Sequence, residues 1–268
     1  VVDTFFVSHI PDTAQITAMG DKAINALTLA FPVQMLIIAL GVGTGVGTNA
    51  LVAKCLGCGD KEQANRTAGN AILVTLCYSV LIFVFGLAFS HAFIASQTAD
   101  AVIADMGTTY LRIITVFSFG SLGYMCLEKI VMATGKTTIT MICQLAGAIT
   151  NIVLDPVMIY GLFGCPAMGI AGAACATVIG QFVSLAVIAV AYFKKGVGID
   201  TGIRYLAPHR RTLQKMFAIG LPAIIMQILT PIMSYAMNLI LGTISVSAVT
   251  AYGVYYKLQN FIFMPGYG

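Results

Sequence analysis

The sequence predicts an all-α fold, a polytopic transmembrane helix bundle whose second half repeats the first. Of its 268 residues, 59% are hydrophobic and only 9% are charged, whereas soluble domains average roughly 25% charged residues. The apolar residues form several runs long enough to cross the roughly 30 Å hydrocarbon core of a bilayer as helices. Seven cysteines fall mostly inside these runs, so we expect no disulfide framework.

We expect a partial span, six full spans and a final partial span along the chain. The partial spans are 1–8 and 248–268, and the full spans are 26–52, 68–94, 107–133, 139–163, 169–193 and 213–243. Each full span exceeds the roughly 20 apolar residues that a transmembrane helix needs. The chain begins at Val1 and stops at Gly268, in both cases within an apolar run. We therefore expect it to be a fragment of a longer protein.

Basic residues indicate the orientation of the spans, because loops rich in lysine and arginine stay in the cytoplasm. One set of loops, which includes 53–67, 134–138 and 194–212, contains eleven of them. They are Lys54, Lys61, Arg66, Lys129, Lys136, Lys194, Lys195, Arg204, Arg210, Arg211 and Lys215. The other set contains only Lys22 and Arg112. The first set is therefore predicted to be cytoplasmic, in a multi-pass protein of the cell (plasma) membrane.

The longest cytoplasmic loop, 194–212, is interpreted as a linker between two lobes. Its glycines and proline are Gly196, Gly198, Gly202 and Pro208. Residues 1–193 would then form the N-terminal lobe and 213–268 the start of the C-terminal lobe. A weak internal repeat supports this division, since a shift of 225 residues lays Ala26 on Ala251. Transporters are often built from such repeats.

Several motifs favour a structural interpretation. Glycines occupy every second position of 41–47, but this string lies inside an apolar span and not after a strand, so it predicts close helix packing in lipid and no dinucleotide site. Cys55 and Cys58 have no second cysteine pair nearby, so we expect no zinc site. Glu128 and Lys129 lie near the cytoplasmic end of their span, and we expect both side chains to reach water.

The sequence contains no HExxH motif, no GxSxG motif and no zinc ligand set, so we predict that the protein is not an enzyme. The net charge of +4 requires no nucleic-acid partner.

Asp155 is the most informative residue for function, because it lies inside an apolar run of membrane-spanning length. A charge at the centre of a membrane helix costs at least ~2.5–3.5 kcal/mol, and such residues usually mark a path for ions or substrate. Asn151 lies four residues earlier and shares a helix face with it. Pro156 follows directly and frees a backbone carbonyl one turn before it.

Three spans carry oxygen-bearing side chains at the same depth. Asp3 lies about eight residues from Pro11, Asp155 about nine from Gly164, and Thr177 about eight from Gly169. With Asn151, these residues could ligate Na⁺ through oxygens, chiefly at Asp3, Asn151 and Asp155. Alternatively, two carboxyls at one depth would titrate as a coupled pair, and one could bind a proton near neutral pH. A buried hydrogen-bond network that only joins the helices is the structural alternative.

Three stretches carry a family resemblance: 2–7, then 31–65 with the glycine string, and then 151–177. The chain resembles the multidrug and toxic compound extrusion (MATE) family over essentially its whole length. The resemblance implies twelve spans in two six-helix lobes around a central cleft, so this fragment would run from the end of the first span to part of the eighth. It also implies export of organic, often cationic, compounds in exchange for H⁺ or Na⁺ by alternating access.

The resemblance further implies a cation site in the first lobe at Asp3, Asn151, Asp155 and Thr177. Span 213–243 has no acid, which favours coupling in the first lobe. The expected partners are a small organic substrate and the lipid bilayer, with no cofactor beyond the coupling ion, in a monomer. The polar residues expected to line the substrate cleft are Gln181, Gln227, Asn238, Tyr255 and Lys257.

A flippase for a lipid-linked oligosaccharide or other amphipathic lipid is the alternative function. Such a protein must accommodate a pyrophosphate, so we would expect several arginines or lysines in its cleft. The first-lobe spans show two acids, Asp3 and Asp155, and no base at mid-membrane depth. This pattern favours the cation-coupled antiporter.

Overall fold

The computed structural model describes residues 6–7, 9–10, 19–98, 100–162, 166–194 and 198–242. The helices are α2 (Met19–Gly57), α3 (Lys61–Ala88), α4 (Ser90–Ala95), α5 (Ala101–Val116), α6 (Ser118–Ala133), α7 (Thr137–Tyr160), α8 (Ile170–Lys194), the 3₁₀ turn η2 (Ile203–Leu206) and α9 (Arg210–Gly242). No strand occurs among the described residues. The predicted all-α fold is confirmed.

Five of these helices are long and apolar enough to cross a membrane, and there are six such spans if the bent pair α5 and α6 counts as one. The exposed side of α3 is apolar: Val80, Leu81 and Val84 are 64%, 65% and 53% exposed. An apolar exposed face is what lipid surroundings require. The chain is therefore a polytopic membrane protein.

The span predicted at 107–133 differs from the sequence expectation, because it is two helices bent by 44° at Phe117. Before the bend, the Thr115 hydroxyl donates to the carbonyl of Leu111. After it come Ser118 and Gly120, and sharp bends commonly fall at such small residues. The span predicted at 68–94 is also divided, into α3 and the short α4.

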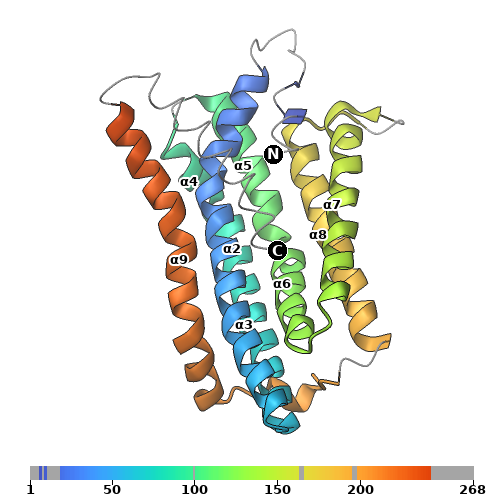
Figure 1. Ribbon diagram of the computed structural model, residues 1–268. Coiled ribbons are helices and arrows are strands. Elements are labelled where there is room, and N and C mark those ends of the chain that lie inside the picture. The colour runs from blue at the N-terminus through green and yellow to red at the C-terminus, as the bar shows by residue number, and fades with distance from the viewer. Residues whose placement is uncertain are drawn as a thin grey trace. The chain divides into compact units, whose positions relative to one another are not determined.

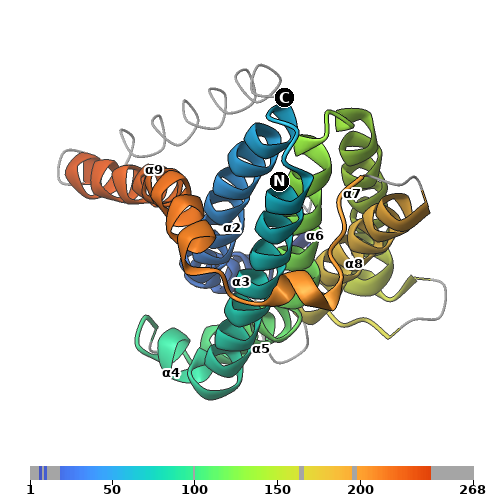
Figure 2. The same cartoon turned by 90° about the horizontal axis from the view of Figure 1, so that it is seen from below.

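The chain divides into two compact units, Val1–Ile224 and Ile225–Gly268. The first unit contains α2 to α8, η2 and the beginning of α9, and α7 and α8 form its most extensive helix pair. Within it, α6 lies between α2 on one side and α7 and α8 on the other (Figure 1 and Figure 2). Of the second unit, the structure describes the remainder of α9. The predicted lobe boundaries at 193 and 213 stay predictions.

The glycines of 41–47 allow α2 to pack closely against two neighbouring helices, α6 and the beginning of α9. A Cβ at Gly41 would meet Met125 of α6, and one at Gly45 would meet the Lys129 stem. A Cβ at Gly43 or Gly47 would instead meet the backbone of the first turns of α9, within the first unit. The packing interpretation of these glycines is therefore confirmed, with alternate glycines facing different helices.

The second part of the predicted linker packs against α3. Oδ1 of Asn70 accepts a hydrogen bond from the His209 backbone nitrogen at 2.9 Å, and Oδ1 of Asn65 accepts one from Asp200 at the same distance. Gly69 lies against the backbone carbonyl of Tyr205, where a Cβ would not fit. Asparagine side chains thus replace secondary structure in satisfying the backbone of this loop.

Candidate cation site

Helix α7 places Asp155 inside the protein. Its side chain is fully buried. The helix continues through Pro156 to Tyr160 and is capped by Gly161, whose φ of +75° is a left-handed conformation that glycine adopts readily. Asn151 lies one turn before Asp155, and its Nδ2 donates to Asp155 Oδ1 across 3.4 Å. The predicted sharing of one helix face by these two residues is confirmed.

Thr177 of α8 completes the described part of the site. Asn151 Nδ2 also lies 3.4 Å from Thr177 Oγ1, and that hydroxyl in turn donates to the Ala173 carbonyl at 3.0 Å. One amide therefore joins the acid of α7 to the hydroxyl of α8. Two glycines make this approach possible, because a Cβ at Gly180 would lie 2.9 Å from the carbonyl oxygen of Gly147.

The donor atoms of this cluster define its chemistry. A carboxylate, an amide and a hydroxyl are oxygen-bearing groups, which suit hard cations such as Na⁺, and the carboxylate can also hold a proton. The described residues contain no group of three or more His, Cys, Asp or Glu side chains that could hold a metal ion.

The structure brings together only part of the predicted set. Asn151, Asp155 and Thr177 are in contact, while Asp3 lies outside the described residues. Its predicted proximity to Asp155 therefore stays a prediction. The segment that follows it does reach this helix, since the Tyr160 hydroxyl of α7 donates to the Phe6 carbonyl at 2.8 Å.

Tyr160 was not among the residues predicted from the sequence. A tyrosine at the end of an apolar span is usually an interfacial aromatic. The residue type alone therefore did not predict its hydrogen bond to the Phe6 carbonyl.

The structure describes only some of the residues that were predicted to line the substrate cleft. Gln181 is half-buried on α8, one turn after Thr177 and on the same helix face. Gln227 is exposed on α9, in the second unit. The side chain of Asn238, and Tyr255 and Lys257 altogether, lie outside the described residues. Their role in a cleft stays a prediction.

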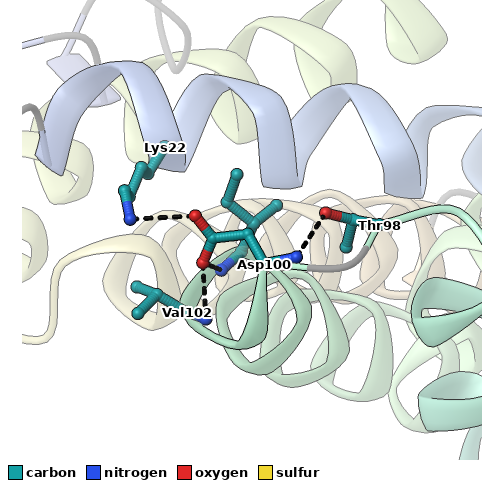
Figure 3. Close-up of polar contacts among 5 residues, drawn as sticks. Lys22, Thr98, Asp100 and Val102 are labelled. Atoms are coloured by element: carbon teal, nitrogen blue, oxygen red, sulfur yellow. Dashed lines mark hydrogen bonds and ion pairs between the residues drawn. The ribbon is translucent and has the colours of Figure 1, made fainter.

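An ion pair joins the beginnings of α2 and α5 (Figure 3). Lys22 Nζ lies 2.9 Å from Asp100 Oδ2, and Asp100 Oδ1 caps α5 by accepting a hydrogen bond from the Val102 backbone nitrogen. The hydrogen bond from Lys22 and the backbone hydrogen bond from Val102 together hold the pKa of Asp100 below its ordinary value. This carboxylate lies outside the spanning helices, so its charge interacts with Lys22 near solvent.

Known proteins resemble this chain in sequence and in fold. The multidrug export protein MepA of Staphylococcus aureus (strain MRSA252) is 26% identical over 262 residues, which make up 97% of this chain and 55% of that protein. Two solved structures of a multidrug resistance MATE family transporter match at 27% identity. The outward-facing conformation gives a TM-score of 0.89 and covers 98% of this chain and 56% of the other, and the inward-facing one gives 0.82 with 98% and 57%.

The chain spans about half the length of the curated relatives it matches. The family model for MatE matches residues 2–157, which is more than half of the chain and includes two of the three contacting site residues. The resemblance seen in the sequence is thereby confirmed, and this polytopic membrane protein belongs to the MatE family.

Proposed function

We propose that the chain forms part of a cation-coupled antiporter that exports organic, cationic compounds across the plasma membrane in exchange for H⁺ or Na⁺. The observation that carries the proposal is the complete burial of Asp155 on a membrane-spanning helix, in contact with Asn151. An ionisable residue at such a place is costly to maintain, and it commonly serves an ion or substrate path. The matching relatives that are named for multidrug export support the same function.

In the proposed cycle, a cation from outside binds at Asp155, Asn151 and Thr177 and neutralises the carboxylate. A cationic substrate then loses its electrostatic partner and leaves. Each inward charge gains ~2.3 kcal/mol per 100 mV of membrane potential, so the cation can drive the export. The related transporter has been solved in outward-facing and inward-facing conformations, which supports alternating access for this protein as well. The loops 53–67, 134–138 and 194–212 would face the cytoplasm.

Transport by the full-length protein in proteoliposomes tests the proposal. A fluorescent organic cation serves as substrate, and a pH gradient and a Na⁺ gradient are imposed separately at fixed membrane potential. Acceleration by either gradient identifies the coupling ion. A transport rate that is the same with and without each gradient would contradict the proposal. Movement of lipid-linked sugars but not of the organic cation would also contradict it.

A further inference from the structure

A second acid lies within the membrane-spanning part of the described structure, at Glu128 of α6. The helix ends at Ala133, so at ~1.5 Å per residue Glu128 lies about 7.5 Å before that end. Its side chain is only 17% exposed, and that of the adjacent Lys129 only 18%. Most of each side chain is therefore covered by protein, and the expectation that the two charged groups extend to water stays a prediction.

The carboxylate of Glu128 has weak protein partners. Lys129 Nζ lies 3.7 Å from Glu128 Oε1, which is too long for a hydrogen bond. The Lys129 stem packs over Gly45 of α2, on a different side of α6. Among the described residues, this ion pair is the one polar contact of the Glu128 carboxylate. Within the described residues, protein groups therefore occupy little of the hydrogen-bonding capacity of this carboxylate.

A buried hydroxyl lies beside it. Tyr124 is four residues earlier on α6, so it shares the face of Glu128. Its Oη is buried and has no hydrogen-bond partner within the described part of the chain. Helix α6 ends at Ala133 and the neighbouring helix α7 begins at Thr137, so Glu128 and Cys143 lie at about the same level, five and six residues from these two ends. Tyr124 and Lys129 on α6 and Cys143 on α7 are therefore titratable groups near the level of Glu128.

Helix α7 links this place to the site at Asp155. Cys143, Gly147, Asn151 and Asp155 follow at intervals of four residues and share one face of the helix. The rise from Cys143 to Asp155 is about 18 Å. Glu128 and Asp155 therefore lie beside opposite ends of the same helix face. On α8, Ser184 donates to the Cys143 carbonyl at 3.1 Å, so one polar side chain of α8 lies at the Cys143 end of this face.

We propose that Glu128, with the Tyr124 hydroxyl, forms a second cation-binding position near the cytoplasmic end of the first lobe, through which the coupling ion leaves after its release from Asp155. The inference rests on the proposed cation coupling. A cation released at Asp155 must cross about 18 Å along α7 to the level of Cys143. An acid with unused oxygen lone pairs next to an unpartnered hydroxyl lowers the energy of that passage. A proton would bind to the carboxylate and leave again, so nothing is consumed.

The first test is transport in proteoliposomes with the full-length protein, comparing Glu128→Gln and Glu128→Asp. Glu62→Gln is the matched control, because Glu62 is 63% exposed in the first turn of α3 and pairs with Arg66. The pH or Na⁺ concentration is varied on the cytoplasmic side and held constant outside. Glu128→Gln should turn over roughly tenfold more slowly, a decade that corresponds to ~1.36 kcal/mol of barrier. It should also lose the dependence on the cytoplasmic cation, and Glu128→Asp should restore much of it.

A second test measures occupancy without transport. Carbodiimide modification of carboxyls is followed by peptide mass spectrometry at Glu128, Asp155 and Glu62 in the wild-type protein. Modification of Glu128 should fall as Na⁺ is added, whereas modification of exposed Glu62 should not respond to Na⁺.

The two tests separate the two proposals. Glu128 modification that does not respond to Na⁺, together with an unchanged dependence on the cytoplasmic cation in Glu128→Gln, would overturn the second position while leaving coupling at Asp155 intact. Wild-type transport that ignores both gradients would overturn the coupling itself, whatever Glu128 binds.

Discussion

The amide nitrogen of Asn151 lies 3.4 Å from Oδ1 of Asp155, one turn farther along α7. The same nitrogen lies 3.4 Å from the Thr177 hydroxyl of α8. A single neutral side chain thus connects the buried acid to the neighbouring helix. Because the charge resides on Asp155 alone within this trio, removing the charge and removing a neutral ligand should have different consequences.

Asp155→Asn should abolish cation-coupled export and leave insertion and folding intact. Asparagine has nearly the same shape and can still accept from Asn151, but it cannot bind and release a proton or neutralise Na⁺. The measurement is substrate efflux under an imposed cation gradient, alongside the thermal midpoint in detergent. Asp105→Asn, at an exposed position of α5, is the control and should transport normally. Efflux at the wild-type rate by folded Asp155→Asn would refute the coupling role.

Thr177→Val should weaken binding of the coupling cation without abolishing transport. Valine keeps the volume of threonine but removes the hydroxyl, and a hydrogen bond near a charge contributes about 1.5 kcal/mol or more. The concentration of cation that gives half-maximal transport should therefore rise roughly tenfold. Thr177→Ser keeps the hydroxyl and should remain near the wild-type value. Equal effects of the two variants would show that packing, and not the oxygen, matters at this position.

The sequence was informative about the site because the cost of burying an acid in lipid is large. Asp155, Asn151 and Thr177 could be selected from residue type, depth and helical spacing, and the structure brings these three together. Tyr124 and Glu128 could not be evaluated in the same way. Whether a charged residue near a helix end reaches water depends on which helices cover it, and that is a property of the tertiary packing.

Gly47→Ala should destabilise the protein by about 1–3 kcal/mol, the range for inserting a methyl group into a filled space. A Cβ there would meet the backbone carbonyl of Met216 and the backbone nitrogen of Gly220, and backbone atoms cannot move aside as a flexible side chain can. Gly57→Ala is the matched control, because a Cβ at Gly57 would meet nothing within 4 Å. Thermal unfolding in detergent compares them. An unchanged midpoint for Gly47→Ala would contradict the close helix contact.

Because of the ion pair between Lys22 and Asp100, we expect part of the free energy of unfolding to depend on pH. The pKa of Asp100 is lower in the folded protein, so the folded state favours the charged form. The stabilisation is complete above the unfolded pKa of about 4. It is lost as the pH falls through the lowered pKa of the folded state. Asp100→Asn should keep the cap on α5 but lose this term, so its thermal midpoint should approach that of the wild type as the pH falls below 4.

A second helix cap provides the control for that experiment. Asp60 caps α3 by accepting from the backbone nitrogen of Gln63, and it has no ion pair within the described residues. Asp60→Asn should therefore show a smaller change in its pH profile than Asp100→Asn. A difference between wild type and Asp100→Asn that persists unchanged at low pH would show that the lysine contributes nothing through charge.

The linker shows where local sequence rules reached their limit. Its glycines and Pro208 predict a loop, and between 198 and 209 the structure describes only the short turn η2. They gave no indication that part of this loop is hydrogen-bonded to α3, because the bonding side chains lie more than a hundred residues away in the sequence. Asn65 and Asn70 lie in a polar helix start and resemble ordinary solvated residues in the sequence. Only the fold reveals that Asn70 is fully buried.

Asn70→Ala should release the linker from α3 and expose it to protease. The Asn70 side chain accepts from the His209 backbone nitrogen and donates to the Arg66 carbonyl at 2.7 Å. Alanine would leave the His209 nitrogen without this acceptor, at a cost of about 1–3 kcal/mol. If opening precedes cleavage and is fast, trypsin should then cut after Arg204 or Arg210 roughly tenfold faster or more, since cleavage follows the population of the open form. Asn65→Ala removes only the bond to the exposed Asp200 nitrogen and should have a smaller effect.

Trypsin applied to sealed vesicles of each orientation also tests the predicted topology, because accelerated cleavage should occur only where the cytoplasmic face is outward. Cleavage at equal rates in wild type and Asn70→Ala would show that the linker is held by other contacts.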